Sequence, residues 1–340
     1  MPNQTTEYAF ASHKPTVEGK IRQQLTDFQV DEDLGFELTG EGEHVCLHVR
    51  KTGANTEWVA KQIARFAQVR NMDVSYAGMK DRYAVTTQWF SIYLGNKPEP
   101  DWSQFTHDEF DILTVTRHSR KIRKGSLKSN RFTLIIRELQ GDVEELEPKL
   151  HWIQQHGIPN YFGEQRFGHD NLDQAIAMLK GELKVKSKHL KGIYLSTIRS
   201  FLFNLVLSER IQRNIWNQAI DGDVMQLDGS QSVFGLEQVT DEITQRLAQF
   251  DIHPTCSLAG EGTPLLSAEA AQLEQTVLQD HRFLIEGLHN ARLKLAHRAT
   301  RIKVEQLEWE QLDAATLKVS FSLEAGSYAT SVLRELILTS

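Results

Sequence analysis

The chain has 340 residues, of which 40% are apolar and 24% are charged, and its formal net charge is -7. This composition is typical of a soluble globular protein, and the length suffices for two domains that each bury a core. Cys46 and Cys256 form no CxxC pair, so we expect two buried thiols and neither a disulfide framework nor a structural zinc site. The N-terminus is polar, and no apolar run approaches the length of a membrane span. We therefore expect a cytoplasmic protein that does not contact a membrane.

The charges are segregated along the chain. Six acidic residues lie between Asp31 and Glu43, whereas residues 117–131 carry cations and no acidic residue. Because phosphate binding depends on clustered Lys and Arg, this distribution matters more for a nucleic-acid partner than the net charge does. The alternative interpretation is a solvated charged loop. The cations in question are Arg117, Arg120, Lys121, Arg123, Lys124 and Lys128.

The first predicted elements are two strands and a helix. Residues 27–32 follow Arg22, and their apolar members Phe28 and Val30 alternate with polar neighbours, as in a half-exposed strand. Phe28 could be a core residue or could contact a base. Residues 45–50 alternate in the same way, and a helix capped by Asn55 or Thr56 should run to about Val69.

A turn with three consecutive charged residues comes next. A short strand, 74–77, leads to Gly78, the turn presents Lys80, Asp81 and Arg82, and a second strand begins near Gln88. A carboxylate between two cations at a strand end favours its ionised form, which suits a nucleophile or an electrostatic stabiliser. Taken alone, such a tripeptide is more often an exposed turn with a local charge pair.

The basic segment ends at Asn130 and Phe132, and a buried strand should cover 133–136. If the segment binds RNA, its cations would follow the backbone while Phe132 stacks on a base. Further along we predict an amphipathic helix over 142–156, an irregular loop over 157–168, helices over 171–180 and 195–211, a helix from Ser267 to about Glu286, a strand over 317–323 and a helix over 331–338.

Taken together and in this order, these motifs resemble the TruD family of tRNA pseudouridine synthases. The family's signature, a Gly-x-Lys-Asp turn followed by Ala-Val-Thr-x-Gln, is complete from Gly78 to Gln88. Residues 159–168 resemble the block that opens the family's insertion domain. The chain departs from the family pattern at three positions, where Leu25 replaces proline, Ser129 replaces glycine and Tyr328 replaces phenylalanine.

The resemblance implies an α+β fold. We expect a catalytic domain with a mixed, largely antiparallel sheet and flanking helices, split by an α/β insertion, the TRUD domain, that only this family has. The expected boundaries are 1–156 for the first part of the catalytic domain, 157–302 for the insertion and 303–340 for the last part.

The resemblance also implies an activity, the isomerisation of uridine to pseudouridine in tRNA at position 13 of the dihydrouridine arm. Asp81 would be the nucleophile, and the base would flip out of its helix into an aromatic pocket. The implied substrate-binding residues are Phe28, Asn130, Phe132, Tyr328, Arg22, Lys80 and Arg82. The reaction involves no redox change and no external group, so we expect no metal and no organic cofactor. We expect a monomer.

Two other functions are compatible with the sequence. One is a non-catalytic module that binds or folds tRNA on the same scaffold, for which an Asp81 variant would behave like the parent in every RNA assay. The other is a hydrolase that uses Asp81 together with a histidine. No histidine accompanies the motifs that surround Asp81, so the sequence favours this hydrolase less.

Overall fold

The computed structural model describes residues 7–168 and 170–339. They form two compact units, each assembled from segments that are distant in sequence. One unit comprises residues 7–15, 151–303 and 330–336, and the other, here called the sheet unit, comprises 16–150, 304–329 and 337–339. The predicted insertion over 157–302 lies within the first of these units. Whether it folds as an independent domain stays a prediction.

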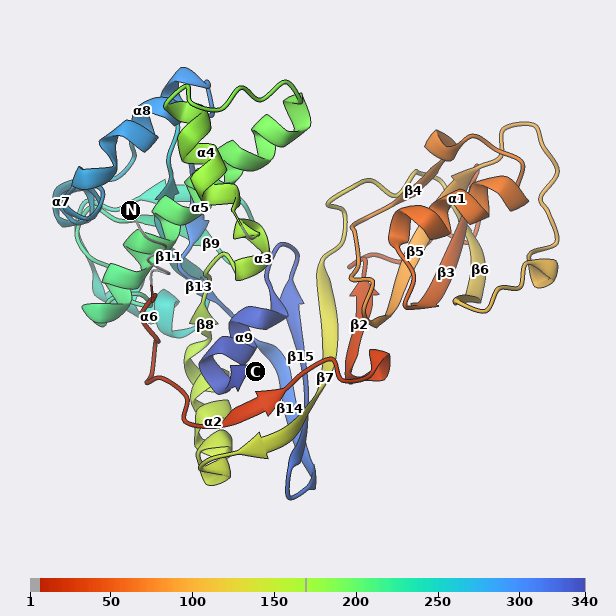
Figure 1. Ribbon diagram of the computed structural model, residues 1–340, viewed down its shortest axis with the longest axis horizontal. Helices are drawn as coiled ribbons and strands as arrows, with labels where there is room; N and C mark the ends of the chain where they lie inside the picture. Colours follow the sequence, from red (N-terminus) through yellow and green to blue (C-terminus); the bar gives the residue numbers. More distant parts are fainter. Residues whose placement is uncertain (1–6, 169, 340) are drawn as a thin grey trace. The chain divides into compact units, whose positions relative to one another are not determined.

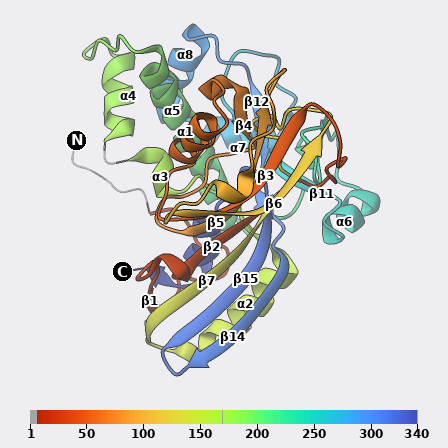
Figure 2. The same cartoon turned by 90° about the vertical axis from the view of Figure 1, so that its right-hand side faces the viewer.

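The sheet unit is built on a ten-stranded mixed sheet with the main order β14-β15-β7-β2-β5-β3-β6 (Figures 1 and 2). The pairs β2–β5 and β1–β16 are parallel, and all other described pairs in this sheet are antiparallel. The α+β fold with a largely antiparallel sheet is therefore confirmed. Its strands are β1 (Glu18–Lys20), β2 (Phe28–Asp33), β3 (His44–Thr52), β4 (Val74–Tyr76), β5 (Val85–Tyr93), β6 (Phe110–His118), β7 (Ser129–Gln140), β14 (Glu305–Asp313), β15 (Thr316–Glu324) and β16 (Leu338–Thr339).

Helix α1 (Thr56–Phe66) covers one face of strands β3, β4 and β5 (Figure 1). It starts where predicted, because the Asn55 side chain accepts a hydrogen bond of 2.9 Å from the backbone N–H of Glu57. Val59 and Ile63 are fully buried in the core between helix and sheet. The helix ends before Val69 because Gln68 adopts a left-handed conformation with φ of 53°.

Strand β7 lies between two partners from opposite ends of the chain. β15 pairs with one edge of β7 over eight residues, and β2 pairs with the other edge over six. Residues 28–33, 129–136 and 317–324 therefore lie side by side (Figure 2). The sequence predicted β2, β7 and β15 but missed β14, because most β14 side chains are exposed and its apolar alternation is limited to Leu307 and Trp309.

The other unit is organised around the long helix α5 (Lys188–Gln212), whose residues Ile198 and Phe203 are fully buried. The helix begins seven residues before the predicted Leu195, since the Ser187 hydroxyl accepts a hydrogen bond from the N–H of Leu190. By length and hydropathy alone α5 could cross a membrane. Its burial is instead that of a core helix.

The helix predicted from Ser267 to Glu286 is interrupted. Leu278 leaves helical geometry, with φ of -94° and ψ of 4°, and its side chain is buried in the core around α5. Both cysteines are free and buried, as predicted. The remaining helices are α2 (Leu146–His156), α3 (Glu164–Phe167), α4 (Asn171–Leu179), α6 (Asp241–Ala248), α7 (Ala268–Val277), α8 (Arg282–Asn290) and α9 (Ala329–Leu336), and the remaining strands are β8 (Ile158–Pro159), β9 (Val224–Leu227), β10 (Val233–Gly235), β11 (Ile252–Leu258), β12 (Ala296–Ala299) and β13 (Arg301–Ile302).

Candidate active site

The turn that carries Asp81 follows β4 and is closed by a buried glutamine. The Gln88 side chain donates a hydrogen bond of 3.2 Å to the carbonyl of Gly78 and accepts one of 2.9 Å from the Thr56 hydroxyl. The same hydroxyl accepts a bond of 3.1 Å from the backbone N–H of Lys80. The first and last residues of the Gly78–Gln88 motif are thus tied together, which holds the charged turn in one shape.

The cation paired with the Asp81 carboxylate is Arg22. Its Nη2 lies 2.8 Å from Asp81 Oδ2, and both side chains are 35% exposed. Lys80 and Arg82, which flank Asp81 in sequence, bind elsewhere. The Lys80 amine lies 2.5 Å from the Glu32 carboxylate, and Arg82 Nε donates to the carbonyl of Gly53. The side chains of adjacent residues in this turn point in different directions. Adjacency in sequence therefore did not identify the partner of Asp81.

Lys51 is a buried cation behind this turn that the sequence analysis did not single out. Its amine donates hydrogen bonds of 2.8 Å to the backbone carbonyls of Asp81 and Ala54, and its side chain has no exposed surface. Burial lowers the pKa of Lys51 to about 8, while the Asp81 charge opposes that shift and Lys80 adds to it. The alternation of Val45, Leu47 and Val49 could have indicated that residue 51 also points inward.

One face of the sheet presents the aromatic residues predicted to contact the base. Val30 is opposite Phe132 in the β2–β7 register, and Phe132 is opposite Phe321 in the β7–β15 register. The Phe28 and Phe132 rings meet edge to face with centroids 6.2 Å apart, and the Phe132 and Phe321 centroids are 5.5 Å apart. The Arg22 guanidinium lies 4.1 Å from the Phe28 centroid. Arg22 therefore connects the Asp81 carboxylate to this aromatic face.

The two predicted base-contacting rings have little exposed surface, with Phe28 at 2% and Phe132 at 8%. Asn130 is opposite Glu32 in the register of β2 and β7, so both side chains lie on the same face of the sheet. Its side-chain oxygen is buried, and no hydrogen-bond partner for it occurs within residues 7–168 and 170–339.

Tyr328 lies in the short connection between β15 and α9, and it is half-buried. This connection starts where Glu324 pairs with Ser129, and the N–H of Ala325 donates 3.1 Å to the carbonyl of Lys128. The connection thus leaves the sheet beside the start of β7, next to Asn130.

Two exposed apolar side chains flank Asp81 and were not predicted as site residues. Met79 is 53% exposed and Tyr83 is 69% exposed. Their place on either side of the motif's aspartate was visible in the sequence, but their exposure was not. Large apolar groups at such exposure are available for contact with a ligand.

The basic segment is an ordered loop. Ile122 is 2% exposed, its N–H donates 3.0 Å to the Ser91 hydroxyl, and the N–H of Gly125 donates 2.7 Å to the carbonyl of Ala77. Arg117 is paired with Glu99 and donates to the carbonyl of Gly42. The other predicted RNA-contacting cations are exposed, namely Arg120, Lys121, Arg123, Lys124 and Lys128.

Within the described part of the chain, no group of three or more His, Cys, Asp or Glu side chains is placed to hold a metal ion. The chemistry that this arrangement supports by itself is that of one accessible carboxylate, a paired arginine and an aromatic face.

Comparison with known proteins connects this arrangement to one family. The family model described as tRNA pseudouridine synthase D (TruD) matches residues 5–184 and 170–336. The chain is 43% identical to tRNA pseudouridine synthase D of Hydrogenovibrio crunogenus, over 99% of this chain and 98% of that protein. It is 46% identical to the protein of that name from Proteus mirabilis, over 96% and 93% of the two chains. A TruD crystal structure from Methanosarcina mazei has a TM-score of 0.76 at 22% identity and covers 97% of this chain and 95% of its own, which shows the same fold.

Proposed function

Because the chain belongs to the TruD family of tRNA pseudouridine synthases, we propose that it isomerises uridine 13 in the dihydrouridine arm of tRNA, with Asp81 as the nucleophile. The observation that supports this most directly is the Asp81 carboxylate itself. It is one-third exposed, it is paired with Arg22 at 2.8 Å, and Arg22 also lies against the aromatic face of the sheet.

The reaction breaks the bond between uracil N1 and ribose C1′ and forms a bond between C5 and C1′. The C5 proton is lost and N1 gains a proton, so the product has the same atoms as the substrate. The Asp81 carboxylate attacks either C1′ of the ribose, which displaces N1 of the base, or C6 of the base, after which the N1–C1′ bond breaks. In both cases the base then rotates, C5 bonds to C1′, and the bond to Asp81 breaks, which restores the carboxylate. Arg22 stabilises the negative charge of the attacking group.

The uracil must leave its helix to reach the carboxylate, at an unstacking cost of a few kcal/mol. The Arg22 guanidinium covers the Phe28 ring, so we infer that the incoming base displaces Arg22 and contacts Phe28, while Phe132 and Tyr328 complete the aromatic contacts. The buried oxygen of Asn130 would accept a hydrogen bond from uracil N3–H, which supplies the partner that this oxygen lacks.

Met79 and Tyr83 would support base flipping by filling the space that the uridine leaves in the RNA helix. Both are exposed beside Asp81, so either can occupy the space in the helix that the extruded uridine leaves. Such contact offsets part of the unstacking cost.

The exposed cations of the basic loop would follow the RNA backbone, each by neutralising a phosphate. They are Arg120, Lys121, Arg123, Lys124 and Lys128. Arg117 contributes less, because it is already paired with Glu99. Lys80 acts indirectly by holding Glu32 beside Asn130, whereas Arg82 is exposed and would exchange its hydrogen bond to the Gly53 carbonyl for one to the substrate.

The test is Asp81→Asn, with Asp108→Asn as the matched control at an exposed aspartate of the same unit. Each protein is incubated with tRNA that lacks the modification, and pseudouridine is detected by base-specific chemical modification and primer extension. We expect Asp81→Asn to lose at least about 10³-fold in rate while it binds tRNA like the parent, and Asp108→Asn to remain active. Complete conversion by Asp81→Asn would remove the nucleophile assignment and favour a non-catalytic role for this turn.

A further inference from the structure

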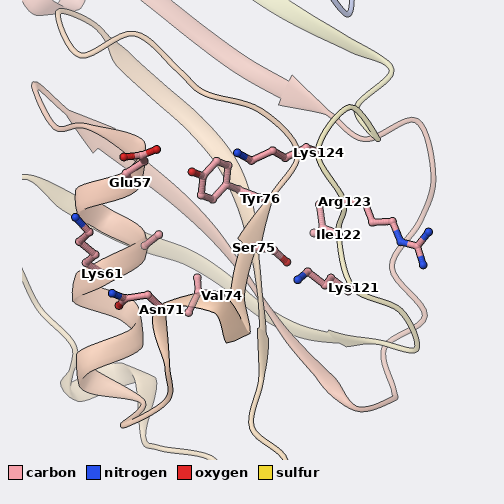
Figure 3. Close-up of a pocket in the computed structure, with 11 residues that line it drawn as sticks. Glu57, Lys61, Asn71, Val74, Ser75, Tyr76, Lys121, Ile122, Arg123 and Lys124 are labelled. Atoms are coloured by element: carbon pink, nitrogen blue, oxygen red, sulfur yellow. The ribbon is translucent and has the colours of Figure 1, made fainter. Parts of the chain in front are cut away.

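A cavity of about 450 Å³ lies between α1, β4 and the basic loop of the sheet unit, and none of the residues assigned to uridine chemistry lines it (Figure 3). Its apolar lining consists of Ala60, Val74 and Ile122, with the Tyr76 ring at one side. Phe90 contacts that ring edge to face at a centroid distance of 5.8 Å and fixes its orientation. The cavity thus has a rigid apolar and aromatic interior.

The rim of this cavity is cationic. Lys124 points toward the Tyr76 ring, with its amine 5.8 Å from the ring centroid, while Lys121 lies beside Ser75 (Figure 3). The Arg123 guanidinium points away from Tyr76, so it serves the outer surface of the loop (Figure 3). Lys61 stands on the α1 side, four residues after Glu57 on the same helix.

The charge balance at the rim favours an anion. Lys121 and Lys124 line the loop side of the cavity, and the lining residues include a single carboxylate, that of Glu57. Asp73 also interacts with Lys121, but its carboxylate is occupied by Arg70 through two hydrogen bonds of 2.9 Å. This local excess of positive charge is opposite in sign to the net charge of the chain, which is -7. Free phosphate would use the rim alone, whereas a nucleotide would use both the rim and the apolar interior.

We propose that this cavity binds a second unpaired nucleotide of the tRNA, distinct from the uridine that is modified. Its base enters against Tyr76 and the apolar lining, and its phosphate lies between Lys121 and Lys124. The Asn71 amide at the rim is placed to hydrogen-bond the edge of the base. This inference rests on the proposed function, because it takes tRNA as the ligand. It assigns the basic loop a defined nucleotide site in addition to general attraction for the backbone.

Asn71→Trp is the informative variant, because it fills the cavity from its exposed rim and changes no charge. Lys121→Glu and Lys124→Glu, made separately, remove the phosphate contacts. Lys318→Glu is the control, since it makes the same charge change on β15, where the Lys318 side chain is 41% exposed, at the other end of the sheet from α1. Folding of each variant is checked by thermal melting. Affinity for unmodified tRNA is then measured at several salt concentrations.

We expect Asn71→Trp to weaken tRNA binding about tenfold with the parental salt dependence, because base stacking is lost and no ion pair is. Each lysine variant should weaken binding and reduce the slope of log affinity against log salt by about one. Lys318→Glu should match the parent. Chemical probing of the bound tRNA should show one protected unpaired base besides the target uridine, and Asn71→Trp should abolish that protection.

Parental affinity and an unchanged protection pattern for Asn71→Trp would overturn the proposal, leaving a charged surface without a base pocket. Absence of a second protected base in the parent complex would do the same, even if Asn71→Trp did not fold. None of these measurements requires turnover. An active Asp81→Asn enzyme would therefore contradict the proposed nucleophile without affecting the outcome at the cavity.

Discussion

Two arginine–aspartate pairs in this protein differ in almost everything except residue type. Arg210 and Asp223, in the unit built around α5, are joined by two hydrogen bonds of 2.8 Å, with side chains 2% and 0% exposed. Asp223 also accepts a bond of 2.9 Å from the N–H of Ile220. Arg22 and Asp81, in the sheet unit, share one bond of 2.8 Å, and each is 35% exposed.

The comparison teaches how burial separates a structural carboxylate from a reactive one. The oxygens of Asp223 are occupied by protein donors and shielded from solvent, so they are not available to a ligand. Removing one partner of such a pair leaves a buried charge uncompensated, which is strongly destabilising. Asp81 keeps oxygen surface available to a ligand, and an exposed pair contributes little to stability.

The same substitution in both pairs should therefore have opposite consequences. Asp81→Asn should lose at least about 10³-fold in pseudouridine formation, because a neutral amide is a poor nucleophile, with a free energy of unfolding within about 1 kcal/mol of the parent. Asp223→Asn should keep the parental rate per folded molecule. The measurement is product formation per folded molecule, with the folded fraction taken from circular dichroism. Equal losses of activity in the two variants would break the comparison.

For the free energy of unfolding, Asp223→Asn should have the larger effect and Asp81→Asn the smaller one. Asp223→Asn should lower the free energy of unfolding by about 3–5 kcal/mol, because it leaves the Arg210 charge buried without its carboxylate. Urea titration followed by circular dichroism measures this loss. The matched control is Glu209→Gln, which breaks the exposed Glu209–Arg213 pair and should change stability by less than about 1 kcal/mol. A comparable loss in the control would mean that burial is not the deciding variable.

Lys51 makes the stability of the sheet unit depend on pH. Its pKa is about 8 in the folded protein against 10.5 ordinarily, so the unfolded chain binds more protons between these values. The folded protein therefore carries the cost of a buried charge below about pH 8 and gains stability as the pH rises toward 10.5.

Relative to Lys51→Met, the parent should gain up to about 3 kcal/mol across that window. Urea titrations of both proteins from pH 7 to pH 10 measure the difference, with Lys318→Met, at a partly exposed lysine, as control. Parallel stability curves for parent and Lys51→Met would show that the amine is solvated.

We also expect Lys51→Met to slow pseudouridine formation about 10- to 100-fold at unchanged tRNA affinity, because the Asp81 backbone loses its anchor.

Arg22→Ala tests the contribution of the arginine to the Arg22–Asp81 pair. It removes the partner of Asp81, so we expect roughly a tenfold lower kcat. The melting temperature should hardly change, because the pair is one-third exposed. Steady-state kinetics together with thermal melting give both numbers. A large drop in melting temperature would place Arg22 with Arg210 among the structural arginines.

The smallest effect is expected at Tyr83. Tyr83→Ser removes an exposed ring beside Asp81 and should reduce kcat/KM by roughly five- to tenfold, because less stacking compensates for the extruded base. The reduction should shrink on a tRNA with a mismatch at the target uridine, where unstacking costs less. Equal reductions on paired and mismatched tRNA would indicate a different role for this ring.

Much of the fold was predictable because its signals are local. The cap at Asn55, the alternation in β2, β3 and β15, and the turn at Gly78 each involve residues a few positions apart, and the structure has all of them. β14 and the first turns of α5 were missed. The former has an exposed, polar sequence, and the latter begin in a lysine-rich stretch that resembles a loop.

The sequence by itself determined the family motif, the identity of the candidate nucleophile and the positions of the cations and rings around it. Only the tertiary structure decided that Arg22 pairs with Asp81, that Lys51 anchors its backbone, and that Lys80 turns to Glu32. The physical reason is that the partner of a side chain depends on the direction in which the side chain points and on which residues the pairing of β2, β7 and β15 places next to it. Those strands come from both ends of the chain, so no local pattern records their meeting.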